Sequence, residues 1–217
     1  MEFVEIPEVV ILRLPVYVRA LTQLTDECIS VVSSQQLGAH LQISPAQIRK
    51  DLSYFGRFGK QGRGYNVGFL LRELRDILCL DRQWTACLIG VGRLGRAIIN
   101  YPGFTPESFK IVSAHDHDTS QIGQMIGDLV IQPMSELAES ILSKDINIGI
   151  VAVPAIHAQE VVDCLVENKV SGILNYAPIV PKVSDNIVLR NIDPVLSLQS
   201  MTFYLGKRDG REHIRRA

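Results

Sequence analysis

The sequence predicts an α/β protein of two dissimilar domains, a winged helix-turn-helix followed by a Rossmann-like parallel sheet. Residues 13–55 hold three helical patterns with tight breaks between them, and residues 56–65 hold four glycines among aromatic and basic side chains. From Trp84 onward, short apolar strands alternate with helical patterns, and a glycine-rich turn follows the first strand. The 217 residues are enough for two domains of this kind.

The distribution of charge points to a nucleic-acid partner. The chain has a net charge of −1, with 47% hydrophobic and 21% charged residues, the balance of a globular rather than a disordered protein. Residues 37–65 contain five basic residues and one acid, whereas residues 83–205 contain seven basic and twelve acidic residues. The near-neutral sum therefore joins a basic segment to an acidic body.

Other classes of protein are disfavoured by what the sequence lacks. Residues 1–5 carry no positive signal region, and no apolar run reaches the about 20 residues that cross a bilayer. We therefore expect a cytoplasmic protein with no membrane partner. The widely spaced cysteines form no Cys-x-x-Cys pair, which predicts buried apolar thiols rather than a disulfide framework or a metal site. They are Cys28, Cys79, Cys87 and Cys164.

The helix-turn-helix is justified by helical spacing and by start signals. Apolar residues recur at helical spacing through residues 13–25, and Ser33 with Gln36 forms a capping-box pattern for the second helix. Ser44, Pro45 and Gln47 together open the third helix, which we expect to run to Phe55. Its polar face is predicted to carry Gln47, Lys50, Asp51 and Tyr54, with Arg49 and Ser53 beside them.

A winged unit follows from the segment after the third helix. Residues 56–65 predict a β-hairpin wing, residues 68–79 a closing helix and residues 80–83 a linker. We expect the third helix to face DNA, with Arg49 or Lys50 reading guanine or contacting phosphate, and the wing to hold the backbone or enter a minor groove. An ordinary solvated helix is the alternative for this basic face. The candidate DNA-binding residues are Ser44, Gln47, Arg49, Lys50, Ser53, Tyr54, Lys60 and Arg63.

The second half alternates strands with helices, which predicts a parallel sheet covered on both sides. Expected strands are residues 85–89, 110–114, 129–131, 146–153 and 172–174. Expected helices are residues 94–99, 134–142 and 155–168.

The glycine-rich turn predicts dinucleotide binding. Gly90, Gly92 and Gly95 lie between a strand and a helix, and Asp116 follows at the end of the next strand. In this pattern the glycines allow a tight turn, close approach of the pyrophosphate and close helix packing. A carboxylate at Asp116, or at the competing Asp118, would accept hydrogen bonds from the hydroxyls of the adenosine ribose and favour NAD(H) over NADP(H). The alternative is a plain glycine turn beside an acidic surface loop.

Evidence for catalysis is weak. A dehydrogenase needs a proton donor or acceptor near the nicotinamide, and the candidates are His157 and Tyr176. Neither belongs to a recognisable catalytic pair, and about 120 residues of such a fold leave little room for a substrate domain. We therefore predict no catalytic residues, while a small NAD-dependent oxidoreductase with an accessory helical domain is the alternative function.

Several strings together resemble the redox-sensing transcriptional repressor Rex family. They are Ile48-Arg-Lys-Asp-Leu-Ser-Tyr-Phe-Gly56, Gly62-Arg-Gly-Tyr-Asn-Val67, Ile89-Gly-Val-Gly-Arg-Leu-Gly95, Gly172-Ile-Leu-Asn175 and Ile192-Asp193. The resemblance covers residues 6–205. It implies a homodimer that binds a palindromic, inverted-repeat operator on double-stranded DNA when free or NAD⁺-bound, and releases it when NADH rises.

The resemblance also implies a division of the chain and a set of ligand residues. Residues 1–80 would be the DNA-binding domain, 81–193 the NAD(H)-binding domain, and 194–217 a domain-swapped exchange helix with a basic tail. It suggests a charge-sensing set formed by Arg19, Tyr101 and Asp193. The implied cofactor-binding residues are Gly90, Val91, Gly92, Arg93, Leu94, Gly95, Tyr101, Asp116, Asp118, Val153, Pro154 and Asp193. The chain departs from the family at His115, where an apolar aromatic usually precedes the acid, and in its basic tail.

Overall fold

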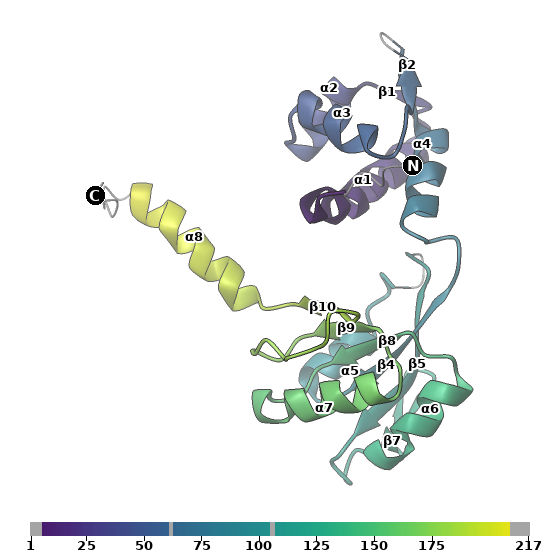
Figure 1. Ribbon diagram of the computed structural model, residues 1–217, viewed down its shortest axis with the longest axis vertical. Helices are drawn as coiled ribbons and strands as arrows, with labels where there is room; N and C mark the ends of the chain where they lie inside the picture. Colours follow the sequence, from purple (N-terminus) through teal and green to yellow (C-terminus); the bar gives the residue numbers. More distant parts are fainter. Residues whose placement is uncertain (1–5, 61–62, 105–106, 209–217) are drawn as a thin grey trace. The chain divides into compact units, whose positions relative to one another are not determined.

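The computed structural model describes residues 6–60, 63–104 and 107–208, apart from the side chains of Lys60, Lys207 and Arg208 (Figure 1). The chain forms two compact units, Met1–Arg82 and Gln83–Ala217. Among the described residues, none of the helices is long and apolar enough to cross a membrane. The tail beyond residue 208 lies outside the description.

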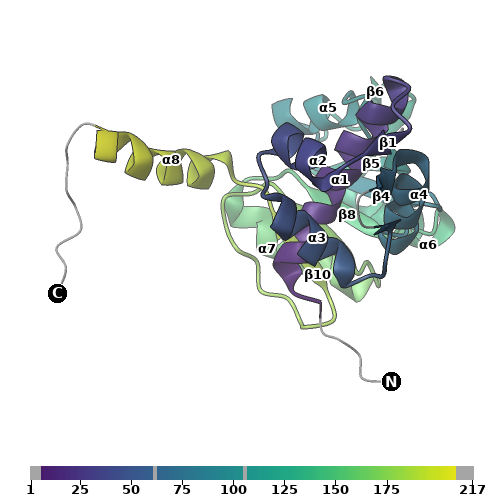
Figure 2. The same ribbon diagram turned by 90° about the horizontal axis from the view of Figure 1, so that it is seen from above.

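The first unit is a helix-turn-helix with a small wing. Its helices are α1 (Glu8–Asp26), α2 (Ser34–Leu41), α3 (Pro45–Ser53) and α4 (Val67–Ile77). Its strands β1 (Val31–Val32), β2 (Gly59–Lys60) and β3 (Gly64–Asn66) pair antiparallel in the order β1-β3-β2. Figure 2 shows α2 and α3 as neighbours. The predicted helix-turn-helix and hairpin are therefore confirmed, with α1 longer than its predicted segment.

The helix caps explain where α2 and α3 begin. Ser33 and Gln36 form the predicted capping box at α2. At α3, the Gln47 backbone N–H donates to the Ser44 hydroxyl at 3.2 Å, but the Gln47 side chain turns toward Asp51. The predicted capping box at α3 is therefore only half formed, and the helix ends at Ser53, short of the predicted Phe55.

The second unit contains a seven-stranded sheet in the order β10-β9-β8-β4-β5-β7-β6. Every pairing is parallel except that of β6 with β7. The central strand β4 lies between β5 and β8, so the strand order reverses there, as at the switch point of a doubly wound fold. The strands are β4 (Trp84–Ile89), β5 (Phe109–Asp116), β6 (Met125–Ile126), β7 (Leu129–Pro133), β8 (Ile148–Val151), β9 (Gly172–Asn175) and β10 (Val188–Asn191).

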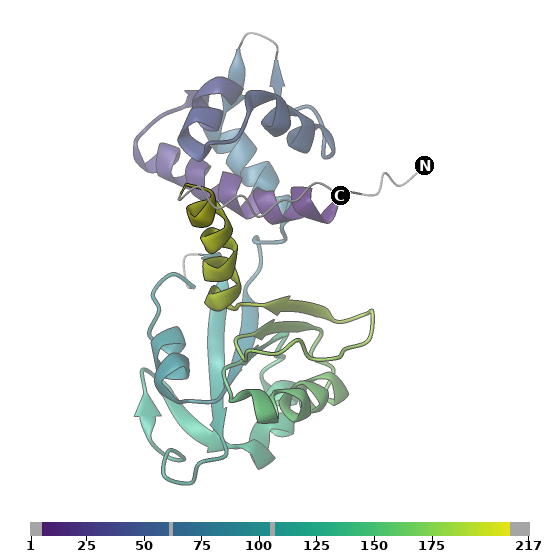
Figure 3. The ribbon, with the colours of Figure 1, turned by 90° about the vertical axis from the view of Figure 1, so that its left-hand side faces the viewer.

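Helices cover both faces of this sheet, as the sequence predicts. The helix α5 (Arg93–Ile99) packs on the face that presents Leu88 and Ala114, whereas α6 (Leu137–Ser143) and α7 (Ala155–Glu167) pack on the face that presents Ile89. Figure 3 shows α5 and α7 on opposite sides of the sheet. A short 3₁₀ turn, Met134–Glu136, replaces the first residues of the predicted helix 134–142.

The last element, α8 (Pro194–Arg208), presents apolar side chains to solvent in the single chain. Leu196, Leu198 and Phe203 keep 61%, 59% and 48% of their surface exposed. A helix with such side chains exposed is typical of an element that another chain covers.

The predicted burial of the cysteines is partly wrong. Cys87 is fully buried, and burial raises the pKa of its thiol to about 12. Cys28 and Cys79 are exposed, because each follows a helix C-cap in the left-handed conformation, with φ of 59° and 53°. Among the described residues there is no cluster of three or more metal-ligating side chains.

Candidate functional site

The exposed face of α3 carries the predicted basic and hydroxyl side chains. Arg49, Lys50 and Ser53 are all exposed. The Arg49 guanidinium donates to the Ser34 hydroxyl of α2 at 3.0 Å, and the Ser53 hydroxyl donates to the Lys50 carbonyl at 2.7 Å. Ser44 caps the helix and Tyr54 is half-buried at its end. The structure thus gathers the predicted cations on one open helical surface.

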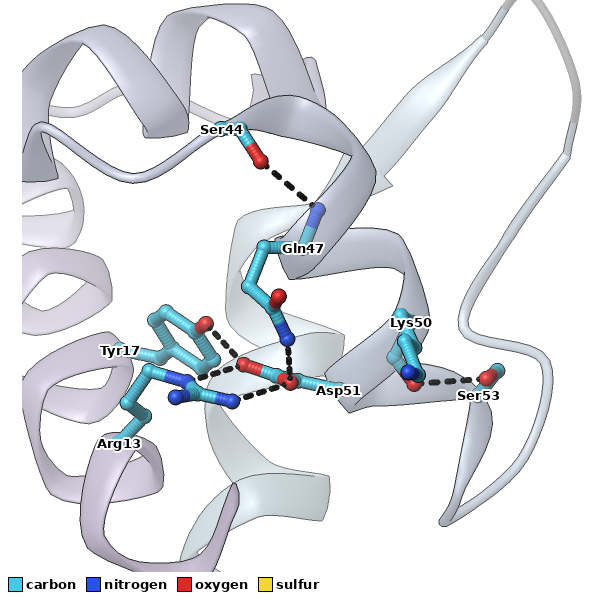
Figure 4. Close-up of polar contacts among 7 residues, drawn as sticks. All are labelled: Arg13, Tyr17, Ser44, Gln47, Lys50, Asp51 and Ser53. Carbon is cyan, nitrogen blue, oxygen red and sulfur yellow. Dashed lines mark hydrogen bonds and ion pairs between the residues drawn. The ribbon is translucent and has the colours of Figure 1, made fainter. Parts of the chain in front are cut away.

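Asp51 corrects the predicted polar face of α3. It is fully buried rather than exposed beside Lys50. Its carboxylate accepts two hydrogen bonds from Arg13 at 2.6 and 2.7 Å, one from the Tyr17 hydroxyl at 2.6 Å and one from the Gln47 amide at 2.7 Å (Figure 4). Burial raises the pKa of the Asp51 carboxyl, but hydrogen bonds from Arg13, Tyr17 and Gln47 outweigh it and the net shift is downward. Asp51 is therefore an ionised internal anchor.

Gln47 is less free to meet DNA than the sequence predicts. It is half-buried at the edge of the open face, and its amide nitrogen is engaged by Asp51. A carboxylate only accepts hydrogen bonds, so the amide nitrogen of Gln47 must face it and the orientation of the amide is fixed.

The wing places Arg63 in the exposed turn between β2 and β3. Gly64 has a φ of +70°, and a Cβ there would come within 2.7 Å of the Val32 carbonyl oxygen. Only glycine therefore lets β3 lie this close to β1 at this point. The backbone of Lys60 lies in β2, but its side chain is outside the described part of the chain.

The glycine-rich turn between β4 and α5 has the predicted tight turn at Gly90 and the predicted close helix packing at Gly95. Gly90 has a φ of +92°, and a Cβ there would lie 2.5 Å from the Ala152 carbonyl oxygen. A Cβ on Gly95 would overlap the Gly90 carbonyl oxygen, so this glycine lets α5 pack on the turn. A Cβ on Gly92 would meet nothing within 4 Å. The open space beside Gly92 is what close approach of a phosphate group requires.

Asp116 ends β5 directly beside that turn. One carboxylate oxygen accepts the Val91 N–H at 2.6 Å, and the other accepts the Asp118 N–H at 2.9 Å. The imidazole of His117 lies 3.3 Å from the same carboxylate. Asp118 is exposed, and hydrogen bonds from Ser120 lower the pKa of its carboxyl. Asp116 is therefore the acid that touches the glycine turn, whereas Asp118 shapes the following loop.

His115 points away from this turn, on the opposite face of β5. Its Nδ1 lies 3.1 Å from the Pro133 carbonyl oxygen, and its Nε2 has no hydrogen-bond partner among the described residues. Burial lowers the pKa of the His115 imidazole, so the ring is neutral at pH 7. A neutral imidazole, one of whose nitrogens has no partner among the described residues, thus occupies this buried position before Asp116.

A cavity of about 350 Å³ opens where the carboxyl ends of β4, β5 and β8 meet. It brings together four of the predicted residues, Gly90, Asp116, Val153 and Pro154. His157 and Cys164, which the sequence reasoning left outside the binding site, also line it. The pattern of residues 151–156 could have indicated His157, since a helix that starts after a central strand points its first turn at this edge.

Other predicted residues lie outside this cavity. Arg93 and Leu94 are exposed in the first turn of α5, and Val91 is buried beneath it. Tyr101 is 58% exposed, with its ring 5.4 Å from that of Phe104. Asp193 accepts the Val195 N–H at 2.8 Å and so begins α8. Arg19 is exposed on α1, in the other unit.

Comparison with known proteins agrees with both units. Residues 5–53 match the family model "Putative DNA-binding protein N-terminus", and residues 81–179 match the model "CoA binding domain". The chain is 49% identical to the redox-sensing transcriptional repressor Rex of Chloroflexus aggregans, over 93% of this chain and 95% of the relative. It is 41% identical to the Rex repressor of Desulfitobacterium hafniense, over 96% and 99% of the two chains.

Solved structures are similar over the same length. The Rex-family repressor RSP in complex with β-NAD⁺ and operator DNA superposes with a TM-score of 0.90, at 34% identity and 95% coverage of each chain. RSP in complex with β-NADH superposes with a TM-score of 0.86, at 32% identity, over 95% of this chain and 97% of RSP. Identity at this level, over almost the whole length, means that the chain belongs to the redox-sensing transcriptional repressor Rex family.

Proposed function

We propose that this chain is a transcriptional repressor that binds an inverted-repeat operator while NADH is scarce and releases it when NADH binds. The observation that carries the proposal is the presence, in one Rex-family chain, of a basic helix-turn-helix and of a glycine-lined cavity at the switch point of a parallel sheet. Membership of a repressor family favours this role over the alternative of a small oxidoreductase.

Operator binding is assigned to α3 and the wing. The exposed side chains of Arg49, Lys50 and Ser53 face the major groove, while Arg63 and Lys60 of the wing contact backbone or minor groove. Ser44, Gln47 and Tyr54 flank this surface. Two copies on a two-fold axis would reach successive major grooves, so we propose a homodimer on a two-fold symmetric site. The exposed apolar surface of α8 supports its exchange into the partner subunit.

The second unit fits a dinucleotide. Gly92 leaves space for a pyrophosphate. Asp116 lies directly beside the turn, where its carboxylate would accept hydrogen bonds from the hydroxyls of the adenosine ribose. The cavity lined by Val153, Pro154 and His157 is large enough for the adenine end. Bound NAD⁺ or NADH would supply the redox signal through the charge of the nicotinamide ring.

Redox selectivity is assigned to residues outside the cavity. Tyr101, Asp193 and Arg19 form the proposed sensing set: the positive ring of NAD⁺ attracts Asp193, and the neutral ring of NADH frees it to pair elsewhere. The expected location is the cytoplasm, where the protein would meet both its operator DNA and the NAD(H) pool.

The deciding experiment is a gel-shift titration of the full chain. An inverted-repeat duplex, first selected by the chain from a random library, is titrated at fixed salt because phosphate contacts make affinity salt-dependent. NADH should release the duplex at concentrations where NAD⁺ does not. A duplex that is not shifted, or a shift that NADH leaves unchanged, would refute the proposal.

A further inference from the structure

Asp51 is the one acid in the basic segment 37–65, and it is also fully buried. Its two oxygens are shared evenly. One accepts from an Arg13 nitrogen and from Gln47, and the other accepts from the second Arg13 nitrogen and from Tyr17. Four charge-assisted hydrogen bonds compensate the burial of a carboxylate, which is otherwise costly.

The donors come from two different helices, as Figure 4 shows. Arg13 and Tyr17 lie one turn apart on α1, whereas Gln47 precedes Asp51 by one turn on α3. The planar guanidinium of Arg13 grips the carboxylate with two parallel bonds, a geometry that defines direction as well as distance. The contact therefore fixes how α3 is rotated about its own axis with respect to α1.

The rotation of α3 decides which side chains face outward. Lys50 is adjacent to Asp51 in sequence, and Arg49 and Ser53 lie within two residues of it. A rotation of one residue on a helix is about 100°. Even a fraction of that would swing the side chains of Arg49, Lys50 and Ser53 off the surface that they share.

We propose that Asp51 is a positioning residue for operator recognition, which aims Arg49, Lys50 and Ser53 by locking α3 to Arg13 and Tyr17 of α1 and touches no base itself. The inference rests on the proposed function, because it assigns a task within the operator-binding surface. It distinguishes reading of sequence, which needs aimed side chains, from attraction to the phosphate backbone, which needs only the cations.

The test compares affinity for the operator duplex with affinity for a scrambled duplex of equal length at the same salt. The variants are Asp51→Asn and a combined substitution, Arg13→Met and Tyr17→Phe with Asp51→Leu. The combined substitution removes the ion pair and the buried Tyr17 hydroxyl that would lose its acceptor, and it keeps apolar volume, an exchange that is often neutral or stabilising for buried pairs. It keeps the test decisive where the single variant fails to fold. Glu27→Gln is the matched control, because it makes the same carboxyl-to-amide change in the exposed pair that Gln23 of α1 forms with Glu27, the C-cap residue of that helix.

The ratio of operator to scrambled affinity should fall at least about tenfold in both Asp51 variants, while binding to the scrambled duplex and NADH binding by the second unit stay within about threefold. Glu27→Gln should leave the ratio unchanged. A folded variant whose ratio equals that of the parent would overturn the inference and leave Asp51 a purely stabilising residue. If the parent itself does not discriminate the operator, the proposed function fails and this inference falls with it.

Discussion

Replacing Gly92 with alanine separates the binding of the dinucleotide from the folding of the glycine turn. In the structure Gly92 has a φ of −72° and a ψ of −160°, which alanine adopts without strain. A Cβ at Gly92 would meet no atom within 4 Å. Alanine gains about 0.4–1 kcal/mol by restricting the unfolded chain, and it is a poorer N-cap than glycine by a similar amount. The free energy of unfolding should therefore change by less than about 0.5 kcal/mol.

The affinity for NADH should respond much more strongly. The methyl group would occupy the space that we assign to the pyrophosphate and would push it away from the backbone N–H groups of the turn. Losing one hydrogen bond to a charged group costs about 1.5–3 kcal/mol, which corresponds to about 10- to 150-fold weaker binding. Operator affinity without NADH should be unchanged, since α3 and the wing are untouched.

Calorimetric titration with NADH and fluorescence anisotropy with the operator measure these quantities, and thermal unfolding checks the fold. The NADH concentration that half-releases the operator should rise by the same factor as the dissociation constant. Gly95→Ala is the contrast, because its Cβ would overlap the Gly90 carbonyl oxygen and should destabilise the unit itself. A folded Gly92→Ala variant with parental NADH affinity would refute the assignment of the turn.

Three further predictions test separate parts of the molecule. His115→Phe should remove a pH dependence of stability. Burial lowers the pKa of His115 in the folded state, so the unfolded chain takes up a proton at a higher pH than the folded chain does. As the pH drops below about 6.5, the free energy of unfolding of the parent should therefore decrease, by at most about 1.4 kcal/mol per pH unit. Denaturant unfolding at pH 7.5 and 5.5 should show this loss in the parent and not in the variant. Lys50→Ala should weaken operator binding. If Lys50 contacts a phosphate, the dependence of log affinity on log salt concentration should become shallower by about 0.9. An unchanged slope with an altered base preference would instead show that Lys50 contacts a base. Asp116→Ser should narrow the preference for NADH over NADPH in a binding titration, and the same effect from Asp118→Ser alone would transfer the role to that acid.

The parts of the fold that local chemistry determines could be predicted from the sequence. The caps at Ser33 and Ser44 act on residues three positions away, and the glycine-rich turn depends only on the backbone conformation of a few consecutive residues. Both could therefore be predicted from the sequence. The parallel sheet followed from apolar strands alternating with helices. The open space beside Gly92 has the same local origin, because its φ, ψ and surroundings depend on the turn alone.

Features that depend on distant partners were missed. Asp51 was predicted on a polar face because helical spacing cannot reveal Arg13, which is 38 residues away. The strand β10 was missed because its residues are mostly exposed and its pairing with β9 is a tertiary contact. The contribution of His157 to the cavity was not predicted, since its place there is set by the crossing of β8 and α7 rather than by its neighbours in sequence.

The proposed switch requires that a redox signal reach the bases through residues that distinguish the two cofactors. NAD⁺ and NADH share the adenosine and the pyrophosphate, so Gly92 and Asp116 in their proposed roles would bind both forms alike and could shift no equilibrium between them. Selectivity must come from the nicotinamide side, where Arg19 of α1 is one of the proposed sensors. The same helix carries Arg13 and Tyr17, which hold Asp51 of α3. Linkage requires that any NADH-dependent loss of operator affinity be matched by an equal operator-dependent loss of NADH affinity.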